Sequence, residues 1–120
     1  MREAPSELQW RIRAMTELNR AREAESRLSC VLGHSSMGVL AAADEVQAAA
    51  REATVWLTAN PCPVSALGAY VARILNTYAE LALYAQRSAT DPSANLEEVR
   101  SHLRDLLAVI VFYSQTLDDW

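Results

Sequence analysis

Apolar positions in the last quarter of the chain recur with the spacing of a helix. Steps of three and four residues alternate along a stripe made of Leu96, Val99, Leu103, Leu106, Ile110, Tyr113, Leu117 and Trp120. A strand would need a period of two, whereas this alternation keeps every member on one side of a helix that packs lengthwise against a neighbour. The pattern therefore predicts a protein built from packed helices.

The same segment is also apolar outside this stripe. Leu107, Val111 and Phe112 lie between the stripe positions, so the middle of the segment is apolar on every face. A helix of this kind is covered on more than one side. We expect the rest of the fold to cover one side and a partner to cover another.

Capping and turn residues divide the chain into helical segments. We expect helices over about 6–32, 36–59, 63–88 and 95–118. Ser6 and Asn95 each begin a capping-box pattern, and Pro63 suits a first helical turn. Gly33 and Gly38 bracket a break between the first two segments.

A single all-α domain over residues 1–120 is the expected organisation, because this length suits one globular domain. The short connections favour an up-down-up-down four-helix bundle. In the alternative, the first helix continues through Gly33 and Gly38, which gives a dimerising three-helix chain. We favour the break, because each glycine costs about 1 kcal/mol inside a helix.

The first two helices are expected to bury different kinds of face. The stripe expected for the first helix is Leu8, Ile12, Met15, Leu18, Leu28, Val31 and Leu32. The face expected for the second is Val39, Ala43, Val46, Ala50 and Ala53. Small faces of this kind permit a close approach between helices.

The up-down arrangement gathers aromatic residues at one end of the bundle. This aromatic set consists of Trp10, Trp56, Tyr70, Phe112, Tyr113 and Trp120. It is interpreted either as a plug of the core or as an exposed anchor, because Trp and Tyr are enriched in interface hot spots. The candidate partner-binding residues are Leu107, Val111, Phe112, Trp120, Trp10 and Trp56.

Composition limits the classes of function. All eleven basic residues are Arg and the net charge is −4, which argues against nucleic acid as a partner. The lack of Lys with abundant Ala is typical of a GC-rich bacterial genome. The longest apolar run is too short to cross a bilayer, and residues 1–5 have no apolar signal region, so we expect a cytoplasmic protein.

Charge is distributed unevenly along the chain. Residues 1–32 hold six Arg and five acids, whereas residues 89–120 hold two Arg and six acids. The two segments could attract each other within a bundle or between subunits. Arg13, Arg20 and Arg27 recur every seven residues, as a solvated face or as charges that select an acidic partner helix such as the last one.

One short motif suggests chemistry. The run His34-Ser-Ser-Met37-Gly38 resembles the His-x-x-Lys-Gly motif of histidine phosphotransfer domains, which are helical bundles of about this size. The resemblance implies His34 as a phosphoacceptor, but Met37 replaces the Lys that would stabilise the phosphoryl charge.

Nothing else in the chain has the spacing of a catalytic or metal site. Cys30 and Cys62 are expected at opposite ends of the bundle as reduced thiols. Glu98 and His102 lie one helical turn apart, but no second Glu-x-x-His pair accompanies them. We therefore expect no metal, no cofactor and no enzymatic activity.

These patterns favour a small interaction module, meaning an adaptor, regulator, chaperone or inhibitor that acts through apolar helix faces. Its expected partner is another protein, a second copy of the chain, or both. Two alternatives are phosphotransfer through His34 and a bundle that binds a small apolar ligand between the second and third helices.

Overall fold

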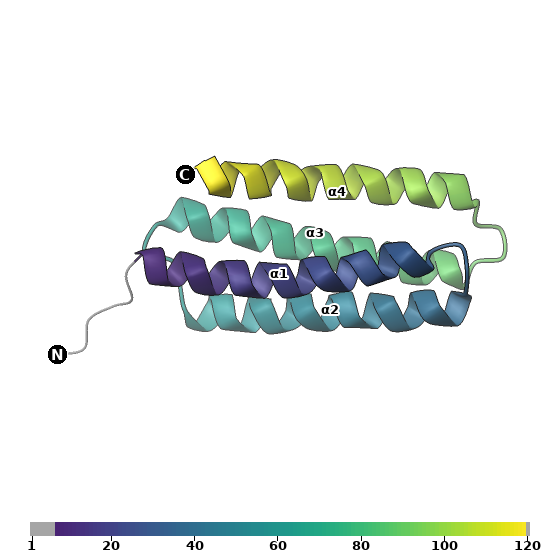
Figure 1. Cartoon of the computed structure of the whole chain (residues 1–120), viewed down its shortest axis with the longest axis horizontal. Helices are drawn as coiled ribbons and strands as arrows, with labels where there is room; N and C mark the ends of the chain where they lie inside the picture. The colour runs from purple at the N-terminus through teal and green to yellow at the C-terminus, as the bar shows by residue number, and fades with distance from the viewer. Residues whose placement is uncertain (1–6, 120) are drawn as a thin grey trace.

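The computed structural model describes residues 7–119 and confirms the all-α four-helix architecture. The helices are α1 (Glu7–Val31), α2 (Ser36–Ala59), α3 (Ser65–Ala89) and α4 (Leu96–Asp119). They run up, down, up and down along a common axis (Figure 1). The predicted boundaries agree with these to within two residues wherever they fall on described residues.

The break between α1 and α2 is confirmed, so the three-helix alternative is wrong. Gly33 has φ +86°, a left-handed conformation that favours glycine and reverses the chain. Ser35 then caps α2, because its Oγ accepts a hydrogen bond of 3.1 Å from the Gly38 amide.

The starts of the other helices show which capping predictions were right. Asn95 caps α4, with its Oδ1 accepting hydrogen bonds from the amides of Glu97 and Glu98. Pro63 was expected in the first turn of α3 but lies outside it, because Val64 is the N-cap residue. The capping box at Ser6 lies outside the described residues.

The core lies around α3, which contacts α1, α2 and α4. The small face of α2 is buried as predicted, and its alanines allow α1 and α3 to approach closely. The stripe of α4 is also directed into the core, with Val99, Leu103, Ile110 and Leu117 buried.

The buried face of α1 differs from the prediction. Leu18 and Leu28 of the expected stripe are buried, but Leu8, Ile12 and Met15 are exposed, and the buried face is rotated away from them. That face consists of Trp10, Ala14, Glu17, Leu18, Ala21, Ala24, Glu25 and Leu28. Its alanines meet the alanines of α2 at close range, which the larger side chains would prevent.

None of the described helices combines the length and the apolar character that a membrane span requires.

Candidate interaction surface

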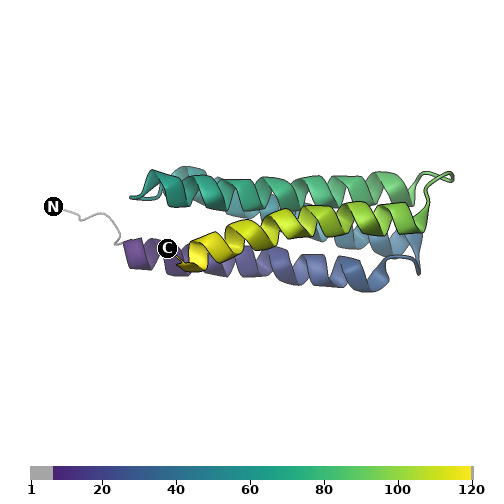
Figure 2. The ribbon, with the colours of Figure 1, turned by 90° about the horizontal axis from the view of Figure 1, so that it is seen from above.

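The first and last helices are neighbours whose backbones stay further apart than those of the other adjacent helices. Among the described residues, no Cα atom of α1 lies within 8 Å of a Cα atom of α4. Their polar link is a hydrogen bond of 2.7 Å, which Arg11 Nη2 donates to the carbonyl oxygen of Leu117. Figure 2 shows α4 crossing from α3 at its start toward α1 at its end.

Arg11 identifies the flank of α1 that faces α4. Leu8 and Met15 lie three residues before and four residues after Arg11, so all three side chains share that flank. Leu8 is 68% exposed and Met15 is 42% exposed. Ile12 is also exposed and lies next to them, further from α4. The α4-facing side of α1 therefore carries exposed apolar side chains in the first half of the helix.

The contact at Gly33 identifies the matching flank of α4. A Cβ atom on Gly33 would lie 3.2 Å from Arg100 Nη2, so Arg100 faces the end of α1. Leu107 lies seven residues after Arg100, and Val111 lies four residues after Leu107, so the three share one flank of the helix. Leu107 is partly buried, and Val111 is 51% exposed.

These two flanks place apolar side chains at the same level along the long axis of the bundle. Arg11 reaches Leu117 at one end, and Gly33 lies beside Leu96 at the other, so two contacts indicate how α1 and α4 are aligned. At 1.5 Å per residue, Met15 and Val111 then lie within about 5 Å of the same level along the bundle axis. We call the two flanks together the α1–α4 surface: Glu7, Leu8, Arg11, Met15 and Arg22 of α1, and Arg100, Arg104, Leu107, Val111 and Asp118 of α4.

Phe112 lies outside this surface. It is 63% exposed, and its ring meets the Tyr113 ring edge-on at 5.3 Å between centroids. Tyr113 in turn contacts Tyr70 of α3 at 5.8 Å. Phe112 therefore extends the exposed apolar area of α4 on the side of α3, about 100° around the helix from Val111.

Three tryptophans are among the candidate partner-binding residues. Trp10 is only 3% exposed, and its Nε1 donates a hydrogen bond of 2.7 Å to the Asn60 carbonyl oxygen. Its ring lies 5.7 Å from the ring of the half-buried Trp56. This pair therefore belongs to the core and not to an exposed anchor. Trp120, the third candidate, lies outside the described residues.

The arginines that recur on α1 face α2 and not α4. Arg27 Nε lies 2.9 Å from Glu45 Oε2, and Arg20 Nη1 lies 3.7 Å from Glu52 Oε2. Arg13 pairs within α1. Inside the bundle, these three arginines therefore do not pair with the acidic residues of α4.

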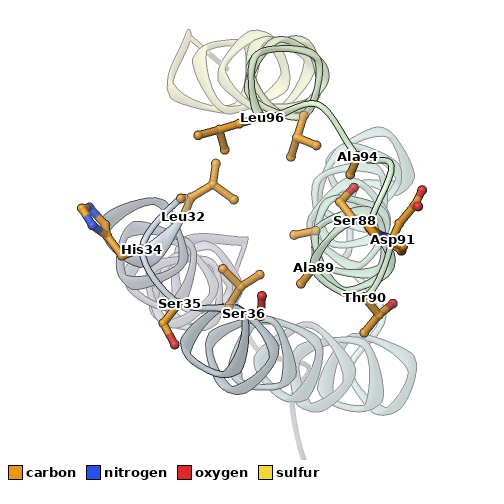
Figure 3. Close-up of a pocket in the computed structure, with 15 residues that line it drawn as sticks. Leu32, His34, Ser35, Ser36, Ser88, Ala89, Thr90, Asp91, Ala94 and Leu96 are labelled. Atoms are coloured by element: carbon orange, nitrogen blue, oxygen red, sulfur yellow. The ribbon is translucent and has the colours of Figure 1, made fainter.

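A hollow of about 480 Å³ opens at the other end of the bundle, where all four helices terminate. Leu32 and Leu96 point into it (Figure 3). Hydroxyl groups of Ser36 and Ser88 lie near the mouth. A shallower hollow of about 360 Å³ lies between α2 and α3, next to Leu75.

His34 lies at the edge of the end hollow but points away from it (Figure 3). It belongs to the turn between α1 and α2, where its amide donates to the Val31 carbonyl. The other histidine, His102, packs its ring on Tyr84 at 4.1 Å. Over residues 7–119, no three His, Cys, Asp or Glu side chains lie close enough together to hold a metal ion.

Polar groups inside the bundle are few and partnered. Glu25 is buried and accepts a hydrogen bond of 2.6 Å from Ser29 Oγ. Burial, followed by the nearby Glu25 carboxylate, raises the pKa of Tyr78 to about 12. Cys30 and Cys62 are both free thiols, as expected.

Comparison of the chain with protein-family models, with curated proteins and with solved structures gives no match.

Leu107 and Val111 of α4 are candidate partner-binding residues from the sequence alone, because they lie outside the buried stripe of their helix. Leu8 and Met15 of α1 are not among those candidates. Leu8 and Met15 were assigned to the core because they are the larger apolar residues. The spacing of Trp10, Ala14, Ala21 and Leu28, which is also helical, was the available signal for the alternative face.

Proposed function

We propose that the protein is a non-enzymatic helical interaction module that binds a protein partner through the α1–α4 surface. The observation that supports this proposal is the exposure of large apolar side chains on two facing flanks that do not cover each other. Apolar side chains gathered in this way lower the free energy of association when a partner removes them from water.

Charged residues at the ends of the surface favour a specific interface over non-specific hydrophobic association. Glu7 and Asp118 lie at one end, and Arg22 and Arg104 lie toward the other. Specific interfaces commonly have an apolar centre and a polar rim. An adaptor, regulator, chaperone or inhibitor would use such a face without catalytic groups.

The experiment is native mass spectrometry of the protein expressed in its own host, for the wild type and for Met15→Asp/Val111→Asp. The expected result is a complex with another polypeptide, or with a second copy, that the double variant loses while it keeps its helical circular dichroism. Val55→Asp is the matched control, because Val55 is a similarly exposed apolar residue on α2. An unchanged complex in the double variant would contradict the proposal.

The end hollow supports a second candidate function, the binding of a small apolar ligand. Its lining, which combines apolar residues such as Leu32 and Leu96 with the hydroxyl groups of Ser36 and Ser88, suits a compact molecule with both apolar and polar groups. Ala89→Trp, which would fill the hollow, is expected to abolish any thermal shift caused by such ligands. A library of apolar small molecules that shifts neither protein would contradict this candidate.

A further inference from the structure

Apart from Arg11, which is bonded to the Leu117 carbonyl oxygen within the chain, the charged residues of the α1–α4 surface are basic at one end of its apolar centre and acidic at the other. On α4, Val111 lies midway between Arg104 and Asp118, seven residues from each. Spacings of seven keep all three side chains on the same flank. The helix therefore has a basic side chain and an acidic side chain at equal distances, about 10 Å, on either side of an exposed valine.

The matching flank of α1 repeats this arrangement. Met15 lies between Glu7 and Arg22, eight residues from one and seven from the other. Because Met15 and Val111 lie at nearly the same level along the bundle axis, the basic ends of both helices lie on the same side of the apolar centre. Glu7 and Asp118 lie on the opposite side.

The charges at the basic end are available for a partner. Arg22 and Arg104 are exposed, and neither forms an ion pair within 4 Å among the described residues. Arg100 adds a third cation there, with its nearest carboxylate, Glu97, at 3.9 Å. At the acidic end, Asp118 is exposed and Glu7 is partly exposed.

We propose that the occupant of the α1–α4 surface is a second copy of the chain, packed antiparallel about a twofold axis that passes beside Met15 and Val111. This inference rests on the proposed function, since it names the partner of the same surface. A twofold interface requires a self-complementary surface, and a basic end and an acidic end placed symmetrically about an apolar centre provide one.

The antiparallel orientation follows from the charges. It places Arg104 against the partner's Asp118, and Arg22 against the partner's Glu7. A parallel orientation would instead place the basic ends together and the acidic ends together, and like charges in contact oppose association. Val111 then faces the partner's Val111 across the axis.

The area of the surface indicates how strongly two copies would associate. It is about 27 Å long from Asp118 to Arg100 and about two helix widths, or roughly 20 Å, across. Pairing would therefore bury roughly 500 to 600 Å² on each copy, near the lower limit for specific interfaces. We expect a dimer that dissociates at micromolar concentrations.

The test is analytical ultracentrifugation of three purified proteins. The wild type is expected to dimerise at micromolar concentrations. Arg22→Glu/Arg104→Glu and Glu7→Arg/Asp118→Arg are each expected to weaken self-association at least about tenfold, because both ends of each dimer then carry like charges. An equimolar mixture of the two variants is expected to recover dimers, because opposite charges face each other again at both ends.

A charge control and a cross-linking experiment test whether the effect belongs to this interface. Arg51→Glu/Arg87→Glu makes the same change of net charge on α2 and α3 and is expected to leave self-association unchanged. Val111→Cys, in a background with Cys30→Ser and Cys62→Ser, is expected to form a disulfide between copies under mild oxidation, whereas Val55→Cys is not.

Several results would overturn the inference. They are a monomeric wild type at high micromolar concentration, basic-end variants that still dimerise, or a mixture that stays monomeric. If the wild type is monomeric while Met15→Asp/Val111→Asp loses a different polypeptide in its host, the self-pairing fails and the proposed function stands. If that variant changes no complex at all, both fail.

Discussion

The first helix meets its two neighbours in opposite ways. Toward α2 it buries alanines and places Arg20 and Arg27 near carboxylates of that helix. Toward α4 it offers large apolar side chains, Leu8 and Met15, that stay exposed, with Arg11 as the polar link. The contact with α2 is thus complete within one chain, whereas the side facing α4 is left open.

This difference shows that hydrophobicity alone does not decide which face of a helix is buried. The face toward α2 is rich in alanine, which gains little from burial but lets two helices come close and form many van der Waals contacts. The larger residues, left outside, add apolar area where α4 does not cover them. Exposed apolar side chains gathered on one flank of a helix are typical of an association surface.

The largest expected contrast comes from truncating one residue on each face of α1. Leu28 is 1% exposed, so Leu28→Ala is expected to lower the free energy of unfolding by about 2–5 kcal/mol through lost burial and a cavity. Met15→Ala is expected to change it by less than about 1 kcal/mol in the monomer. Urea unfolding followed by circular dichroism measures both, and equal losses would contradict the assignment of the two faces.

A second prediction concerns pH and the interior between α1 and α3. The Tyr78 pKa is raised to about 12 in the folded state, mainly by burial and then by Glu25. Below pH 10 both folded and unfolded chains keep the phenolic proton, so stability is unaffected. Between about pH 10 and 12 the unfolded chain releases it first, so stability should fall, by at most about 3 kcal/mol.

Thermal unfolding at a series of alkaline pH values checks this loss. The matched variant is Tyr78→Phe, which has no proton to release and should lose less stability over the same range. A wild type and variant with parallel pH profiles would show that Tyr78 titrates normally.

The helices and their connections could be predicted because their signals are local. Gly33, Ser35 and Asn95 act through backbone conformation and caps that depend on a few neighbouring residues. Most of the buried stripe of α4 was equally clear, since its alternation of three and four residues continues along the whole helix, although Leu96 at its start is 40% exposed. Pro63 was misplaced by two residues because the side-chain pattern does not fix the first helical turn.

The buried face of α1 could not be predicted from the helix alone. Two helical stripes were present, one with Leu8 and Met15 and one with Ala14 and Ala21, and single-helix hydrophobicity favours the first. The choice depends on the shape of α2, whose alanines match the second stripe. The α1 half of the candidate surface was missed for the same reason.

The turn between α1 and α2 offers a third test, because it sets the distance from α1 to α4 at one end. Gly33→Ala would place a β-carbon at φ +86° and about 3.1 Å from Leu96 Cδ2. The left-handed backbone alone costs about 1–2 kcal/mol. We expect a loss of this size in urea unfolding, whereas Gly38→Ala, which has ordinary contacts in a helix, should be neutral or stabilising.

The smallest expected effect comes from the polar link between α1 and α4. Arg11→Met keeps much of the apolar stem but removes the hydrogen bond to the Leu117 carbonyl, which is worth about 0.5–1.5 kcal/mol. Arg51→Met, on the exposed face of α2, is the control and should be neutral. A loss as large as that of Leu28→Ala would mean that α1 and α4 depend on each other within the monomer. A small loss, with dimerisation intact, would show that this side of the bundle is stabilised mainly through the contacts of α1 with α2 and of α4 with α3, and is free to bind a second copy.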